Sequence, residues 1–486
     1  MDSDVTIEAP FAASFPLPFR VFVLINISIL CWAINLHSLH ALGVDAATAL
    51  DIRPHDSHSF TSLILNAPGP SDTIALARSV YRLCFSYAFV VFCGWSCFRI
   101  STHGELSAVD SYKWIPAVTA LGLVILVICP FNVVERRIRD MFLLAIRRCL
   151  SSPSSMPVYF SDVILADIFT SLAKVIGDVW LSMCMIFPGG SLLVFPAQDG
   201  WTRLLVPCLM SIPYAIRFRQ CIIDYMQPTT TTKKSLYNAL KYASSFPVIF
   251  LSAAQRTIAT DTGDVDVEEH PLFKLWLLSV IVNSLYSFWW DISNDWGLEV
   301  LKPKQGVSRH ILKPLLLPSL QAHNSTSDGS PPMHARRISL PPSVNGGSNY
   351  NTSQRYPWGL RPILLFPLPA YPFAVFANLV LRLTWSLKLS SHLHAQVSRA
   401  LLFFWLELAE LLRRWLWVFF RVEWECVKIA TEREDRGGHT PMTERNGMFD
   451  TEEYEVVELG PSRRLSGSSP GNVDPDNKTD HRHSFS

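Results

Sequence analysis

Residues 377–425 read ANLVLRLTWSLKLSSHLHAQVSRALLFFWLELAELLRRWLWVFFRVEWE, and this stretch decides the class of the protein. Its apolar residues are dense enough to span a lipid bilayer, yet they enclose Arg382, Arg413 and Arg414. An arginine at bilayer depth costs about 2.5–3.5 kcal/mol on insertion scales, so three facing lipid would cost roughly 8–10 kcal/mol. We therefore expect the three guanidinium groups to face a protein interior or an aqueous cavity. We interpret that interior as the path of an anion.

The helical spacing gives each arginine a different local neighbourhood. Arg382 and Trp385 lie three residues apart on one helical face, and Glu410 precedes Arg414 by four residues, the spacing of a helical ion pair. Structural ion pairs are therefore the alternative to an anion path. Arg382 and Arg413 have no comparable local partner, which favours the path.

The composition of the chain is that of an all-α polytopic membrane protein. The 486 residues are 49% hydrophobic with a mean hydropathy of +0.22, and the apolar residues occur in long blocks. Blocks of about 20 apolar residues predict nine transmembrane helices. These lie near 20–42, 78–99, 114–131, 158–187, 201–226, 237–258, 272–292, 361–387 and 397–421.

Charge and motif content exclude several function classes. The net charge of +1 indicates no nucleic-acid partner, because such a partner needs a concentrated basic face. The chain contains no nucleophile-and-base arrangement, Walker loop or zinc signature, so we expect no enzyme, metal site or cofactor. Its ten cysteines have no C-x-x-C spacing, and most lie within or at the ends of apolar segments.

Basic residues occur in alternate loops, and this pattern orients the chain in the membrane. Lys and Arg follow the third, fifth and seventh predicted spans, whereas the loop 259–271 is acidic. We therefore place the basic loops and the C-terminal tail in the cytosol, and residues 1–19 in the lumen or exterior. The sequons at Asn324, Asn351 and Asn477 then face the cytosol, where no glycan is added.

Composition also predicts the boundaries between the regions of the chain. Residues 20–154 hold the first spans and an amphipathic, Arg-rich segment, 134–150, which we place along the cytosolic interface. Residues 155–425 hold the remaining spans. The loop 303–358 is rich in Pro, Ser, Gly and Asn, and the tail 426–486 has mixed charges, so we expect both to be disordered in the cytosol.

The fourth predicted span carries a polar stripe on an otherwise apolar helix. Its members recur at intervals of three and four residues: Asp167, Thr170, Ser171, Lys174 and Asp178. The stripe either pairs across a helix interface or forms a pore wall whose hydroxyls bind a permeating oxyanion.

Three other spans carry polar residues near their ends. Lys241 and Tyr242 lie just inside the sixth span and combine a cation with a hydroxyl, which suits a phosphate-sized ligand. Asp291 and Asp295 lie four residues apart at the end of the seventh, among tryptophans typical of an interfacial belt. The belt explains the tryptophans but not the carboxylates. Arg217 lies near the cytosolic end of the fifth, where an arginine can extend to water at little cost.

Six blocks of sequence form a recognisable set in order. They are Leu165–Asp167, Ile212–Cys221, Asn238–Tyr242, Trp290–Gly297, Leu381–Trp385 and Glu410–Glu423. Together they resemble the EXS domain, over roughly residues 155–425. That family holds phosphate exporters with an SPX module and shorter, ER-retention-defective Golgi proteins.

The resemblance implies a helical phosphate-export channel whose second half lines the pore. It places on pore or phosphate-contacting positions Asp167, Lys241, Tyr242, Asp291, Arg382, Trp385, Arg413 and Arg414. Thr170 and Ala173 stand where the exporters tend to carry an amide and a hydroxyl, so conductance and selectivity can differ.

About 19 residues precede the first predicted span, too few for an SPX module, so the chain resembles the ER-retention-defective branch. This resemblance implies a Golgi-membrane protein that returns luminal phosphate, a by-product of glycosylation, to the cytosol. It also implies a part in retaining ER luminal proteins and in recycling glycosyltransferases.

We therefore predict a passive, gated phosphate transporter. Arg382, Arg413 and Arg414 attract the anion, Lys241 and Tyr242 coordinate it, and Asp167 and Asp291 hold the cations in place. Two alternatives stay open. One is a trafficking adaptor whose cytosolic tail binds sorting or coat proteins without any transport, and the other is a proton-coupled carrier. The sequence leaves the oligomeric state open, a homodimer included.

Overall fold

The computed structural model describes residues 9–44, 46–50, 71–151, 157–194, 196, 202–228, 232–262, 271–298, 360–361, 364–389 and 399–437. By its internal contacts the chain divides into two units, Met1–Glu434 and Asp435–Ser486. All described residues except 435–437, at the end of the last helix, belong to the first unit. The loop 303–358, predicted to be disordered, lies outside the described residues, as does the tail from residue 438 onward.

Every regular element among the described residues is a helix, as the composition predicts. In chain order these are α1 (Ala9–Ser14), α2 (Leu17–Ala41), α3 (Ala46–Ala49), α4 (Ser71–Thr102), α5 (Leu106–Val109), α6 (Trp114–Ile128), α7 (Arg136–Ser151), α8 (Phe160–Ser171), α9 (Ala173–Ile186), α10 (Thr202–Met226), α11 (Lys234–Ala243), α12 (Ser245–Thr262), α13 (Pro271–Trp290), the π-helical turn η1 (Asp291–Asp295), α14 (Ala370–Leu389) and α15 (Arg399–Gly437).

Within the part of the chain that the structure describes, three helical stretches are long and apolar enough to cross a membrane: Leu17–Ala41, Thr73–Thr102 and Pro271–Asp295. Two shorter apolar helices are Trp114–Ile128 and Ala370–Leu383. The α4 helix exposes Phe85, Phe89 and Phe92 along one face, as a lipid-facing surface requires. Trp114–Ile128 carries no charged residue but is short, whereas the remaining predicted spans contain buried charges, which lower their hydropathy. The count of nine remains a prediction.

Three of the predicted spans are not continuous α-helices. The fourth is divided at Leu172 into α8 and α9, and the sixth at Ser244 into α11 and α12. Pro247 accounts for the second division, because its ring would clash with the carbonyl of Ala243 in an unbroken helix. The seventh span ends in η1, where the Trp296 N–H reaches back five residues to the Asp291 carbonyl. Such interruptions at membrane depth occur where the backbone is buried in protein or lines a cavity.

The last two helices begin or end away from their predicted positions. The eighth span was predicted from residue 361, yet α14 begins only at Ala370, after Pro367 and Pro369. The α15 helix continues to Gly437. Residues 426–437, which the sequence placed in the disordered tail, are therefore helical.

Ion pairs on the surface of α15 explain this extension. Glu425 accepts from Arg421 and from Lys428, each at 2.9 Å, so that charged residues prolong the helix after its apolar part ends. The hydroxyl of Thr431 also donates to the carbonyl of Val427.

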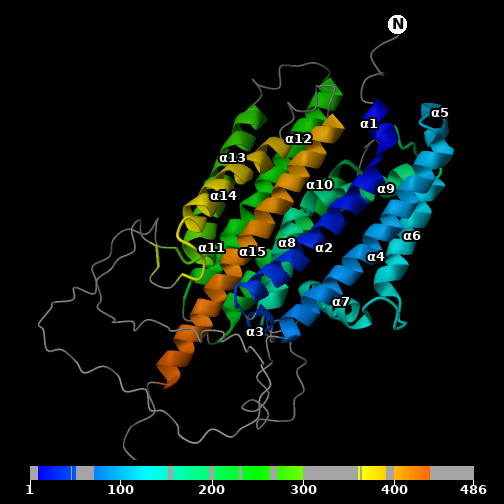
Figure 1. Cartoon of the computed structure of the whole chain (residues 1–486). Coiled ribbons are helices and arrows are strands. Elements are labelled where there is room, and N and C mark those ends of the chain that lie inside the picture. The colour runs from blue at the N-terminus through cyan, green and yellow to red at the C-terminus, as the bar shows by residue number, and fades with distance from the viewer. Residues whose placement is uncertain are drawn as a thin grey trace, which may run out of the picture. The chain divides into compact units, whose positions relative to one another are not determined.

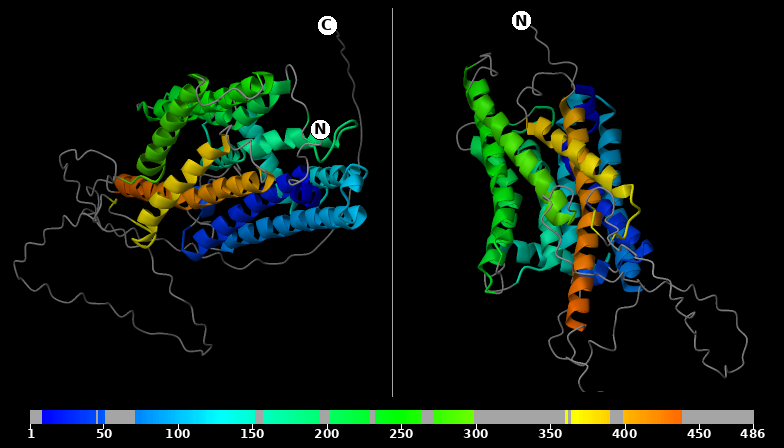
Figure 2. Two further views of the ribbon diagram at one scale, coloured as in Figure 1. Left: turned by 90° about the horizontal axis from the view of Figure 1, so that it is seen from above. Right: turned by 90° about the vertical axis from the view of Figure 1, so that its left-hand side faces the viewer.

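The long helices run side by side along one direction (Figures 1 and 2). On one side of the bundle α2 packs on α4, and α4 packs on α6. On the other side α12 packs on α13, and α13 packs on α14. The α10 helix connects the two sides through its contacts with α8, α9, α11 and α12. Buried Trp417 and Val418 of α15 share a core with Leu36 of α2 and Tyr371 of α14.

The Arg-rich segment predicted at the interface forms α7, which lies at the lower end of the bundle in Figure 1. One arginine of this helix, Arg139, does not lie at the surface. Arg139 is fully buried and donates to backbone carbonyls at 2.6–3.0 Å, and these belong to Leu126, Cys129, Phe131, Val133 and Val134. It thereby caps α6 and holds the turn that leads into α7.

Gly297, two residues after the end of η1, offers a test of how tightly this turn is held. Its φ is +62°, and a Cβ there would lie 2.4 Å from the ring of Trp424. We expect Gly297→Ala to lower the free energy of unfolding by about 2–4 kcal/mol, from left-handed strain and overpacking together. Thermal unfolding of the purified full chain measures the change.

Gly122→Ala is the matched control for this substitution. Gly122 lies inside α6, where a Cβ would meet only Val90, at an ordinary 3.7 Å. Alanine is the better helix former there, so stability should hold or rise by up to about 1 kcal/mol. Equal losses in the two variants would contradict the tight packing inferred at Gly297.

Candidate functional site

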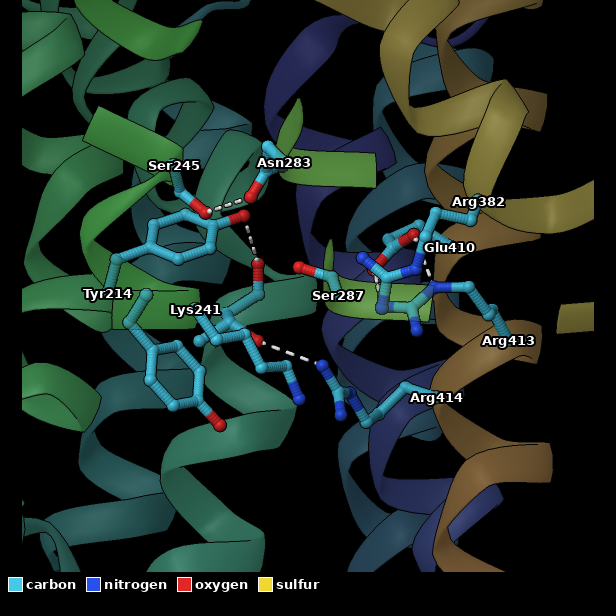
Figure 3. Close-up of a pocket in the computed structure, with 11 residues that line it drawn as sticks. Tyr214, Lys241, Ser245, Asn283, Ser287, Arg382, Glu410, Arg413 and Arg414 are labelled. Carbon is cyan, nitrogen blue, oxygen red and sulfur yellow. Dashed lines mark hydrogen bonds and ion pairs between the residues drawn. The ribbon is translucent and has the colours of Figure 1, made fainter. Parts of the chain in front are cut away.

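A polar pocket opens in the interior of the bundle, where residues from seven helices meet. Its lining consists of Thr170, Tyr214, Lys241, Tyr242, Ser245, Asn283, Ser287, Arg382, Glu410, Arg413 and Arg414. Figure 3 shows the three arginines with Glu410 on one side, Tyr214, Lys241 and Ser245 on the other, and Ser287 between them. Four lining side chains are cationic and one is anionic.

Asp291 is the carboxylate that joins the two sides of this site. It is 1% exposed and accepts from Lys241 Nζ at 2.8 Å and from Arg382 Nη2 at 2.5 Å, while Arg413 Nη1 lies 3.6 Å away. The π-helical turn also brings Asp295 to Lys241, at 3.0 Å. One segment thus holds cations from α11, α14 and α15.

A second carboxylate, Asp167 of α8, organises the opposite edge. Tyr242 Oη donates to Asp167 Oδ1 at 2.7 Å, and Arg217 Nε donates to the same oxygen at 3.1 Å. Arg217 is 3% exposed and also donates to Gln220 Oε1 at 2.5 Å. The prediction that Arg217 extends to water is therefore wrong.

A signal for Arg217 was present in the sequence. Arg217 and Gln220 lie three residues apart on α10, within one of the six blocks that carry the family resemblance. An arginine at the membrane surface has no need of an amide partner on its own face, so this pair indicated an interior position.

The ion pairs on α15 differ from those that the spacing favours. Glu410 bonds to Arg413, with Oε1 at 2.6 Å from Nη2 and Oε2 at 3.0 Å from Nε. The alternative pairing of Glu410 with Arg414, four residues on, is not formed. The expectation that Arg413 has no comparable local partner is therefore wrong, whereas Arg382 and Arg413 also share a distant partner, Asp291. Their partner Asp291 is 91 residues from Arg382 in sequence, so local spacing could not reveal it.

Arg414 differs from the other cations that line the pocket. It is 7% exposed, and it donates to Ser171 Oγ and Thr170 Oγ1, each at 3.0 Å. Its guanidinium carbon lies 4.6 Å from the ring centre of Trp417. No carboxylate among the described residues lies within ion-pair distance. Asp167 and Glu410 interact with this charge only from beyond ion-pair distance, so the guanidinium keeps the capacity to bind a counter-ion directly.

The net charge of the site also favours the binding of an anion. The pocket, its direct ion-pair partners and the adjoining Asp167–Arg217 pair contain five cations and four carboxylates, which leaves one positive charge. The cations are Arg217, Lys241, Arg382, Arg413 and Arg414, and the carboxylates are Asp167, Asp291, Asp295 and Glu410. A monovalent anion would neutralise the site.

Eight of the nine candidate residues come together at this site: Asp167, Thr170, Lys241, Tyr242, Asp291, Arg382, Arg413 and Arg414. Trp385 lies in α14, outside the residues whose side chains the structure describes. Lys174 and Asp178 pair with each other on α9, beyond the break at Leu172, and do not line the pocket.

Sequence reasoning missed five lining residues: Tyr214, Ser245, Asn283, Ser287 and Glu410, the last of which it named only as an ion-pair partner. Asn283 and Ser287 did carry a signal, because they lie four residues apart in the apolar α13. Tyr214 and Ser245 did not stand out from their neighbours. In the described part of the chain, no cluster of His, Cys, Asp and Glu side chains has the arrangement of a metal site.

Several known proteins are similar to this chain over about two thirds or more of its length. The chain is 26% identical to Protein ERD1 homolog 2 of Schizosaccharomyces pombe, over 87% of this chain and 99% of that protein. It is 28% identical to Phosphate transporter PHO1 homolog 9 of Arabidopsis thaliana, over 68% of this chain and 34% of that one. It is 26% identical to SPX and EXS domain-containing protein 5 of Dictyostelium discoideum, over 66% and 30%.

These relatives confirm the resemblance drawn from the six blocks. The EXS family model matches residues 15–427, which is more than the part of the chain that the blocks cover. Because that match spans most of the sequence, this chain is a membrane protein of the EXS family.

Proposed function

We propose that this protein transports inorganic phosphate across the Golgi membrane, from the lumen to the cytosol. The observation that carries the proposal is Arg414, a buried guanidinium with no carboxylate partner in the described residues, at a pocket with one excess positive charge. An anion that enters the pocket supplies the missing counter-charge. Arg382 and Arg413 line the same pocket, so several guanidinium groups can share one tetrahedral oxyanion.

The arrangement of the charges suits transport better than tight storage. Each cation other than Arg414 already has a carboxylate partner, so the pocket attracts an anion without surrounding it with free positive charge. Conduction requires a site strong enough to admit an ion and weak enough to release it. The helix interruptions beside the pocket also supply elements that can rearrange during passage.

The substrate and the compartment draw support from the relatives. One relative is named a phosphate transporter, and others are ERD1 proteins that match most of this chain. Under this proposal the protein returns phosphate released during glycosylation, and thereby supports glycosyltransferase recycling and retention of ER luminal proteins. The topology in this proposal has nine spans, a luminal N-terminus and a cytosolic C-terminus, and rests on the alternation of basic and acidic loops.

Flux through the purified full chain tests the proposal. Proteoliposomes loaded with radiolabelled phosphate should release it down its gradient faster than protein-free liposomes, while co-loaded glucose stays inside. Retained glucose shows that the membrane is intact. The protein used must elute as a single folded species. If its proteoliposomes then release phosphate no faster than protein-free liposomes, the transport function is ruled out.

A further inference from the structure

Glu410 is the one carboxylate that lines the polar pocket, and it is not fully engaged. A carboxylate has about four acceptor positions. Arg413 occupies two of them and the hydroxyl of Ser171 a third, at 2.9 Å from Oε1. One position on Oε2 therefore stays open. The side chain is 2% exposed, so bulk water does not compete freely for it.

The remainder of the pocket presents donors. Lys241, Arg382 and Arg414 can only donate. Asn283 Oδ1 accepts from the hydroxyls of Ser244 at 2.8 Å and Ser245 at 3.2 Å, which leaves its amide group as a donor toward the pocket. A ligand therefore meets many N–H and O–H groups together with one strong acceptor.

We propose that Glu410 makes the site selective for tetrahedral oxyanions that carry a proton, and against fully deprotonated dianions. This inference rests on the proposed transport of phosphate. Near neutral pH phosphate and arsenate retain an O–H group, which can donate to Glu410 Oε2 while the other oxygens accept from the arginines. Sulfate and selenate have no proton at that pH, so one of their oxygens would face a carboxylate lone pair.

The charge balance of the site supports the same selectivity. The excess of one positive charge matches a monoanion, whereas a dianion would leave a net negative charge buried inside the bundle. Shape cannot make this distinction, because sulfate and phosphate are both tetrahedral and close in size. The proton is the feature by which the two differ.

Competition on the unaltered protein gives the first test. Release of radiolabelled phosphate from proteoliposomes is measured at neutral pH. Arsenate, sulfate or selenate is present as the competing anion on both sides of the membrane. Arsenate should compete at concentrations close to those of phosphate, while sulfate and selenate should be about ten- to hundredfold weaker, the effect of one hydrogen bond to a charged group. Sulfate as effective as arsenate would overturn the proposal.

The variant Glu410→Gln gives the second test. Its amide can donate to a bare oxyanion, and loss of the carboxylate raises the excess positive charge of the site to two. The preference for arsenate over sulfate should therefore fall about tenfold or more, chiefly through a gain for sulfate. An unchanged preference would contradict the role of Glu410. If the variant does not fold, the competition series on the unaltered protein still decides the question.

Glu407→Gln is the matched control. Glu407 is buried on α15 one turn before Glu410 and does not line the pocket, so its replacement should leave the oxyanion preference unchanged. A fall as large as that in Glu410→Gln would mean that helix charge, and not the open acceptor, sets the preference. Failure of this inference is also distinct from failure of the transport function. Absence of all phosphate flux removes both, whereas phosphate flux with equal sulfate competition removes only the selectivity.

Discussion

Replacing Arg414 with glutamine should abolish phosphate flux while leaving the protein folded. The two effects separate because the guanidinium bonds only to Thr170 and Ser171. Thr170 Oγ1 also donates to the Asp167 carbonyl, and Ser171 Oγ to Glu410, so both hydroxyls keep partners when the arginine is gone. The variant buries no unpaired charge, and we expect its free energy of unfolding to change by less than about 1 kcal/mol.

The loss of transport should be large. Removing one partner of a buried, charged hydrogen-bonded contact weakens binding by about 2–5 kcal/mol, which corresponds to a thirtyfold or greater loss of affinity. Phosphate release from proteoliposomes and thermal unfolding of the same preparation measure the two quantities together.

Arg421→Gln provides the comparison on the same helix. Arg421 lies two turns further along α15, pairs with Glu425 at 2.9 Å and does not line the pocket. Its replacement should leave flux within about twofold of the unaltered protein, because its ion pair lies outside the pocket. Equal flux in both variants would show that the unpartnered guanidinium does not bind the anion.

The contrast between Arg414 and its neighbours shows what a sequence can reveal about such a site. Arg382, Arg413 and Arg414 stand out because a charge inside an apolar span is unfavourable, and that property is local to the span. The choice of partner is not local. Glu410 is four residues before Arg414 and three before Arg413, and both spacings suit a helical pair. In the structure Arg414 bonds instead to Ser171 and Thr170 of α8, and Arg413 lies between Glu410 and Asp291. These contacts come from other segments of the chain, so no pattern along α15 predicts them.

Of the helix interruptions, one can be predicted from the sequence and another cannot. Pro247 marks the end of α11 in the sequence, because a proline excludes an unbroken helix four residues earlier. Leu172 carries no such mark, yet α8 ends there and Thr170 and Ser171 face Arg414. The overall set of helices could be predicted from apolar blocks, whereas the breaks beside the pocket depend on tertiary contacts.

Replacing Asp291 with asparagine should produce the largest loss of stability. Asp291 is within ion-pair distance of Lys241, Arg382 and Arg413, so its neutralisation leaves three cations facing one another in a buried site. Breaking a buried pair by removing one partner costs about 3–5 kcal/mol, and we expect a loss in that range or above. The midpoint of thermal unfolding and the yield of folded protein after extraction both report it.

Asp295→Asn separates this effect from a general loss of acidic charge in η1. Asp295 contacts Lys241 alone, and Lys241 keeps Asp291 at 2.8 Å when Asp295 is neutral, so we expect a loss of only about 1–2 kcal/mol. Adding Arg382→Gln to Asp291→Asn should restore part of the stability, because Arg382 is the cation that loses its ion-pair partner, whereas Lys241 keeps Asp295 and Arg413 keeps Glu410. If the loss of stability in the double variant equals the sum of the losses in the two single variants, Asp291 and Arg382 act independently. The cations of the pocket would then not depend on η1 for their position.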